Sequence, residues 1–69
     1  MRIQVNGAER ELAPDSSLRD LLNSLSLPHD RVAIEVNGNV IRRAEWPLAI
    51  LNEGDRVEIV HFVGGGSGS

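Results

Sequence analysis

Apolar and polar residues alternate over residues 1–5, which is the pattern of a β-strand that buries one face. Asn6-Gly7 follows directly and is a strong signal for a two-residue hairpin turn. A second strand over residues 8–12 is therefore expected to pair antiparallel with the first.

The only helical pattern follows Pro14. Ser17 and Asp20 have the spacing of a capping box, although Asp is a weaker partner there than Glu. Leucines then recur at i, i+3, i+4 and i+7, which lays one apolar stripe along a helix of roughly ten residues. The stripe consists of Leu18, Leu21, Leu22 and Leu25, and we expect it to cover one face of the sheet.

The second half of the chain carries two more alternating stretches. Residues 32–36 read as a strand that Asn37-Gly38 turns back into an extended segment over residues 40–41. Residues 42–46 read as a short helical or irregular connection that Pro47 ends.

A turn over residues 52–55 leads into the last strand, whose two faces differ. One face carries Val57, Ile59, His61 and Val63, and the other carries Arg56, Glu58, Val60 and Phe62. Both faces thus become apolar toward the end of the strand.

The order strand, strand, helix, strand, short strand, strand over residues 1–63 predicts an α+β domain. It fits the β-grasp (ubiquitin-like) fold, in which a mixed sheet of four to five strands curls around one helix. The last strand should be central and parallel to the first, because the whole domain is traversed between them. A central position would explain why both its faces carry apolar residues.

Three glycines, Gly64, Gly65 and Gly66, follow the last strand, and no further strand pattern comes after them. Glycines without side chains can form a slender tail that threads a narrow channel in another protein. The alternative is a flexible linker. We divide the chain into a domain over residues 1–63, a carrier tail over 64–66, and a linker or cloning remnant over 67–69.

Composition excludes several classes of function. The seven basic residues are all Arg, against ten acidic residues and a net charge of -3, which argues against nucleic-acid binding. Trp46 and Phe62 are the only aromatic residues, so no stacking platform for single strands is expected. The absence of Cys excludes disulfides, iron–sulfur clusters and a cysteine nucleophile within these 69 residues.

Other signals are equally negative. No apolar run approaches about 18 residues and no signal peptide is recognisable, so a cytoplasmic protein without a membrane segment is expected. His29 and His61 have no companion ligands, so no metal site is predicted. The acidic pair Glu53 and Asp55 reads as solvated charge in a turn and not as a catalytic pair.

Several short motifs in a fixed order give the chain a family resemblance over residues 1–66. They are Val36-Asn37-Gly38 with Val40-Ile41, Arg43 and Glu45-Trp46, then Gly54-Asp55 with Val57-Glu58-Ile59-Val60, and finally Val63-Gly64-Gly65-Gly66. In these features the chain resembles the ThiS-type sulfur carriers of thiamine biosynthesis. It departs from them in Arg42, where the family often has proline, and in residues 67–69, which extend past the glycines.

The resemblance implies a carrier function and no catalysis. A ubiquitin-activating-enzyme-like adenylyltransferase would adenylate the carboxylate of Gly66 with ATP, and sulfur from a persulfide donor would convert it to a thiocarboxylate. Thiazole synthase would receive that sulfur. Gly64 and Gly65 would thread the tail into the partner's active site. The chain itself would bind no cofactor, and its lack of Lys and of a Gly-rich phosphate loop agrees with this.

The extension over residues 67–69 limits this interpretation, because an internal Gly66 offers a peptide carbonyl and no carboxylate. The full 69-residue form is therefore expected to be inactive as a carrier. Either these residues were added by cloning or a protease removes them.

A partner-binding surface is predicted beside the tail. Val60 and Phe62 should project from the sheet face opposite the helix, with His61 at the base of the tail, and two apolar side chains there suggest docking. Incidental apolar exposure on a small sheet is the alternative.

Two other functions remain open. The small subunit of molybdopterin synthase resembles the same fold and ends in the same diglycine, although residues 37–46 and the short length favour the thiamine branch. A β-grasp interaction module that uses the glycines only as a tether is the second alternative.

Overall fold

The structure, a computed structural model, describes residues 1–62. The end of the predicted last strand at Val63, the glycine tail and residues 67–69 lie outside the described residues.

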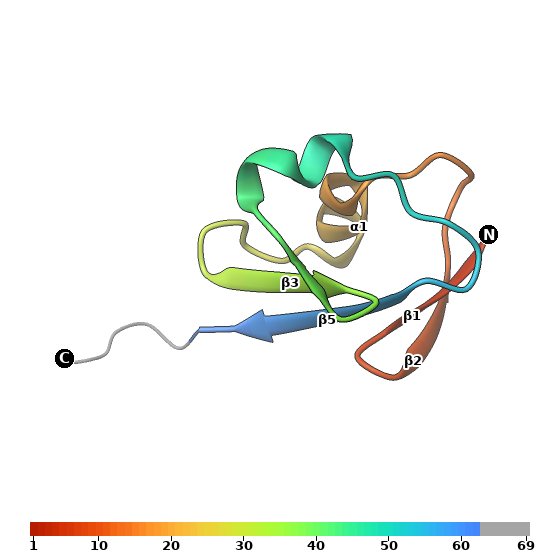
Figure 1. Cartoon of the computed structure of the whole chain (residues 1–69), viewed down its shortest axis with the longest axis horizontal. Helices are drawn as coiled ribbons and strands as arrows, with labels where there is room; N and C mark the ends of the chain where they lie inside the picture. Colours follow the sequence, from red (N-terminus) through yellow and green to blue (C-terminus); the bar gives the residue numbers. More distant parts are fainter. Residues whose placement is uncertain (63–69) are drawn as a thin grey trace, which may run out of the picture.

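One mixed sheet of five strands forms the body of the protein, with helical elements on one of its faces (Figure 1). The strand order is β2-β1-β5-β3-β4, and β5 is parallel to β1 and antiparallel to β3. The elements are β1 (Arg2–Val5), β2 (Ala8–Glu11), α1 (Leu18–Leu25), β3 (Val32–Val36), β4 (Asn39–Ile41), the 3₁₀ helix η1 (Arg43–Leu48) and β5 (Arg56–His61). This arrangement confirms the predicted β-grasp fold with a central last strand.

Both Asn-Gly pairs form the predicted hairpin turns. Asn6 and Gly7 have φ values of 50° and 85°, and Asn37 and Gly38 have values of 52° and 87°. Positive φ at both central residues defines the turn whose twist matches antiparallel strands, and Asn followed by Gly tolerates it best. These turns fix the registers of the β1–β2 and β3–β4 pairs.

The side chain of Asn6 extends the pairing of β5 beyond the end of β1. The backbone bonds between these strands end with the Asn6 N–H, which donates to the Val57 carbonyl at 2.9 Å. Asn6 lies in the turn after β1. Its side-chain oxygen accepts a hydrogen bond from the Ile59 N–H at 2.7 Å, and its side-chain nitrogen donates one to the Ile59 carbonyl at 3.2 Å. The side chain therefore replaces one residue of a paired strand.

Asn37, in the turn between β3 and β4, bonds to Arg56 at the start of β5. Its side-chain oxygen accepts from the Arg56 N–H at 3.0 Å, and its backbone N–H donates to the Arg56 carbonyl at 2.8 Å. Its side-chain nitrogen donates to the Asp55 carboxylate at 3.1 Å. The two hairpin turns thus hold β5 from its two edges, at Arg56 on the side of β3 and at Ile59 on the side of β1.

The helix begins as predicted, with a complete capping box between Ser17 and Asp20. It is shorter than expected because Ser26 adopts a left-handed conformation and its N–H bonds back to the last turn. Three of the four stripe leucines are fully buried, whereas Leu25 is half-buried. The fully buried set on helix and sheet is Leu18, Leu21, Leu22, Ile3, Ile34 and Val57.

The prediction that Pro47 ends the connecting segment is wrong, since η1 runs through it to Leu48. At the start of η1 the Glu45 N–H donates to the Arg42 carbonyl, and at its end the Ala49 N–H donates to the carbonyls of Glu45 and Trp46. Neither end therefore needs an N–H from Pro47. Trp46 is buried, and its indole N–H donates to the Ile41 carbonyl of the edge strand β4 at 2.9 Å. This bond attaches η1 to the edge of the sheet.

The explanation offered for the apolar residues on both faces of β5 is also wrong. Val57 is buried beneath α1, but Val60 is 53% exposed and Phe62 is 56% exposed. Within residues 1–62, both helical elements lie on one side of the sheet and the other face is open (Figure 1). A central strand is therefore buried on one face only.

We predict that removing the Asn6 side chain lowers the free energy of unfolding by about 1–2 kcal/mol, because the Ile59 backbone loses two partners. Asn6→Ala adds the strain of a positive φ, whereas Asn6→Gly does not. Urea unfolding of both variants measures the loss, and the part common to both belongs to the side chain. An Asn6→Gly variant as stable as the parent would show that these hydrogen bonds contribute nothing.

Candidate functional site

The candidate site lies where β5 ends, immediately before the glycines. Hydrogen bonds continue to the last described residue: Val60 pairs with Ala33, His61 pairs with Val32, and the Phe62 N–H donates to the Arg31 carbonyl at 2.8 Å. The backbone is thus attached to β3 through Phe62. Gly64, Gly65 and Gly66, the predicted carrier residues, lie outside the described residues.

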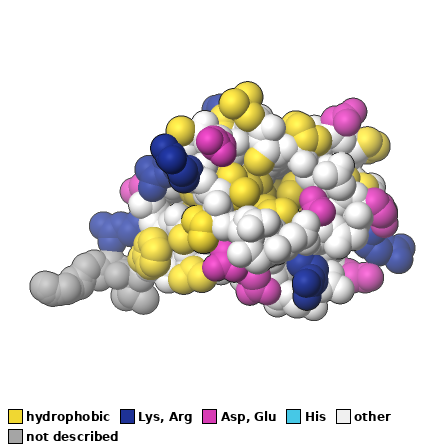
Figure 2. All heavy atoms as spheres, viewed as in Figure 1, with side chains coloured by type: hydrophobic (Ala, Val, Ile, Leu, Met, Phe, Trp, Pro, Cys, Tyr) yellow, Lys and Arg dark blue, Asp and Glu magenta, His cyan; other side chains and the backbone are white. Residues whose placement is uncertain are grey.

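The open face of the sheet carries an apolar patch at this end. Directly paired residues in antiparallel strands point to the same face, so the pairing places Val60, Ala33 and Val40 on the open side. Phe62, two residues after Val60, continues along that side. We call Val60, Phe62, Ala33 and Val40 the β5 patch. Figure 2 shows hydrophobic side chains gathered at the end of the molecule toward which β5 runs.

The predicted exposure of Val60 and Phe62 is found, and their part in partner binding remains a prediction. Val40, 68% exposed, was missed by the sequence reasoning. The Asn37-Gly38 turn could have revealed the exposure of Val40, because the hairpin register that this turn sets places Val40 opposite the outward-facing Glu35. His61 is exposed at the same end, but strand alternation turns it to the helix side.

The rim of the β5 patch is acidic on one side. Glu35 and Glu58 lie directly opposite each other in the β3–β5 pair, an arrangement of like charges that disfavours the sheet. Arg56 shares this face and lines the same shallow hollow as the two carboxylates. The rim therefore presents carboxylates to which basic groups on a partner are complementary.

Two other acidic residues have structural roles, which corrects their interpretation as solvated charge. The Asp55 carboxylate accepts from the Asn52 N–H at 2.8 Å and from the Asn37 side chain. Glu53 accepts from the Arg2 N–H at 2.9 Å. Both hold the turn that leads into β5.

Residues 1–62 contain neither a metal-binding cluster nor a membrane-spanning helix. No group of three or more His, Cys, Asp or Glu side chains in this part of the chain could hold a metal ion. None of the helices in the same part is long and apolar enough to cross a membrane.

Comparison with known proteins identifies the family. The model of the ThiS family matches residues 3–66, which includes the three glycines. The Sulfur carrier protein ThiS of Bacillus subtilis is 37% identical over 65 residues, covering 93% of this chain and 98% of that protein. The crystal structure of the thiamine biosynthesis protein ThiS from Geobacter metallireducens superposes with a TM-score of 0.81 at 32% identity, covering 96% of this chain and all of the other.

Longer relatives also match. The thiazole synthase of Magnetococcus marinus is 36% identical over 66 residues, which is 96% of this chain and 20% of that protein. The thiazole synthase of Paramagnetospirillum magneticum is 34% identical over 67 residues, which is 97% of this chain and 21% of that protein. The chain therefore spans about a fifth of the length of these relatives.

The family match covers nearly all of the domain together with the glycine run, and the superposed ThiS structure has the same fold. The chain belongs to the ThiS family.

Proposed function

We propose that the protein is a sulfur carrier of thiamine biosynthesis and that it carries sulfur as a thiocarboxylate on Gly66. The observation that carries this proposal is the family match through residue 66, which joins the glycine run to the domain as one unit. The name of the Bacillus subtilis relative supports the same function.

The chemistry of the carrier requires activation from outside. A carboxylate is a poor electrophile, and adenylation with ATP gives its carbonyl carbon a good leaving group. The terminal sulfur of a persulfide then attacks this carbon and releases AMP, which leaves an acyl disulfide. A thiol cleaves the S–S bond of the acyl disulfide, becomes oxidised to a disulfide itself, and leaves the thiocarboxylate on the carrier. The chain has no Lys and no Gly-rich phosphate loop, so ATP is bound by a ubiquitin-activating-enzyme-like adenylyltransferase. The carrier contributes the reacting carboxylate and does not act as a catalyst or bind a cofactor of its own.

Thiazole synthase is the proposed acceptor of the sulfur. Two proteins with this name contain a segment similar to nearly the whole of the present chain. A carrier and an acceptor joined in one polypeptide meet at a high effective concentration. The same pair of proteins as separate chains needs a docking surface that brings the tail to the acceptor.

The β5 patch is the proposed docking surface for the partners that act on the tail, the activating enzyme included. It adjoins the point where the tail leaves the domain, and the hydrogen bonds of Phe62 and Val60 to β3 fix the direction of β5 there. Apolar contact with the patch would supply affinity, and basic partner groups beside Glu35 and Glu58 would relieve the repulsion between these carboxylates.

We expect a form that ends at Gly66 to gain about 16 Da when it is incubated with ATP, activating enzyme, a persulfide source and a thiol reductant, because one oxygen is exchanged for sulfur. Intact-protein mass spectrometry measures this gain. The 69-residue chain is the control and should remain unmodified, since its Gly66 carbonyl belongs to a peptide bond.

Two outcomes of this experiment would contradict the proposal. One is thiocarboxylate on the full 69-residue chain, which would place the reacting group elsewhere. The other is an unmodified shortened form under conditions in which the same enzyme modifies another carrier. That second result would favour an interaction module in which the glycines act only as a tether.

Phe62→Ala should weaken binding to the activating enzyme about tenfold or more, because a large exposed aromatic at the patch is lost. Its melting temperature should change little, since the ring is 56% exposed. Leu48→Ala is the matched control, because Leu48 is 77% exposed and lies on η1, on the other side of the sheet. Calorimetric titration measures both variants, and equal affinities for parent and Phe62→Ala would reject the patch.

A further inference from the structure

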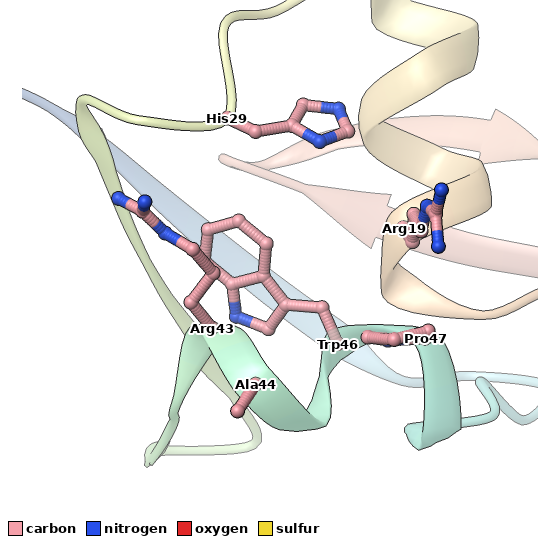
Figure 3. Close-up of a pocket in the computed structure, with 6 residues that line it drawn as sticks. All are labelled: Arg19, His29, Arg43, Ala44, Trp46 and Pro47. Carbon is pink, nitrogen blue, oxygen red and sulfur yellow. The ribbon is translucent and has the colours of Figure 1, made fainter.

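A second surface feature lies on the helix side of the sheet, away from the β5 patch. A hollow of about 220 Å³ is lined by Arg19, His29, Arg43, Ala44, Trp46 and Pro47. Figure 3 shows that its polar side chains come from three segments: Arg19 from α1, His29 from the loop between α1 and β3, and Arg43 from η1. Arg19 and Arg43 lie on opposite sides of Trp46 in this view, and sequence spacing does not show that they line one hollow.

The hollow is cationic in an acidic protein. The chain has a net charge of -3, yet two guanidinium groups and an imidazole line this hollow and no carboxylate does. Asp20, the acid next to Arg19 in the sequence, accepts from the Ser17 N–H at 2.9 Å in the capping box. Its carboxylate is therefore committed to the start of α1.

Trp46 gives the hollow an ordered apolar floor. Its indole N–H is bonded to the Ile41 carbonyl, which fixes the ring. The guanidinium carbon of Arg43 lies 5.8 Å from the ring centroid, in the range of a cation–π contact. The His29 ring meets Trp46 edge-on at 6.3 Å between centroids. Arg43 and His29 are therefore both in contact with the ring of Trp46.

We propose that Arg19, His29 and Arg43 form, around Trp46, a docking site for the acidic side chains of one segment of a partner protein. Arg binds carboxylates through paired N–H donors, which matches Asp or Glu. The floor of Trp46, Pro47 and Ala44 would cover the methylene groups of such a side chain, which a free phosphate lacks. This site does not depend on the proposed carrier function.

The position of the hollow gives it a separate use from the β5 patch. The two surfaces lie on opposite sides of the sheet, so a partner on the patch leaves the hollow accessible. The site therefore suits an acidic arm of the same partner or a second protein. Charge complementarity with Arg would make its binding strongly dependent on salt.

Trp46 provides a direct readout, since it is the only tryptophan in the chain. We expect an acetylated, amidated tetra-glutamate peptide to produce a saturable change in Trp46 fluorescence and in the NMR shift of its indole N–H. Arg19→Gln and Arg43→Gln should each weaken the apparent affinity about threefold or more, as expected for loss of one charge-assisted contact. Arg56→Gln, a change on the open face of the sheet, is the matched control and should have no effect.

Three results would overturn the proposal: no saturable change in the parent protein, equal weakening by Arg56→Gln, or saturation by inorganic phosphate at the same concentrations. The last would assign the hollow to small anions instead of a protein side chain. Arg19 and Arg43 are exposed, so their variants are expected to fold, and circular dichroism checks this.

Discussion

The hydrogen bonding of β5 along both its edges is the constraint on which the rest of the structure depends. β5 lies between β1 and β3, and the Asn6 and Asn37 side chains add hydrogen bonds along its two edges. Its buried residue Val57 joins the core beneath α1. The hydrogen bonds along β5 continue to Phe62, the last described residue.

The protein separates structure from chemistry. The domain supplies a rigid origin for the tail and two surfaces, an apolar patch on the open face and a cationic hollow on the helix side. The reacting group proposed for the carrier is a single carboxylate, and the catalytic groups belong to its partners.

Local sequence signals predicted the parts of the fold that depend on neighbouring residues. The Asn-Gly turns, the capping box of Ser17 and the leucine stripe follow from short spacings, and the central β5 follows from the order of elements. The family resemblance rested on motifs that the comparisons confirm. The tail residues were identified from sequence, and their role remains a proposal.

The sequence could not predict contacts between distant residues. The hydrogen bonds of Asn6 to Ile59 join residues 53 positions apart, and turn chemistry alone accounted for this Asn. The apolar residues on both faces of β5 were explained by its central position because the sequence does not show that one face of the sheet lacks a covering layer. The hollow at Trp46 was missed because Arg19, His29 and Arg43 meet only after α1 packs against η1.

Amide hydrogen exchange at Ile59 tests the central claim most directly. If the Asn6 side chain completes the pairing of β5, the Ile59 N–H exchanges only through global unfolding, with the same opening free energy as buried core amides. Asn6→Gly should then open Ile59 locally while core amides keep the exchange behaviour set by global stability. In the parent protein, an opening free energy at Ile59 well below the global free energy of unfolding would contradict the account.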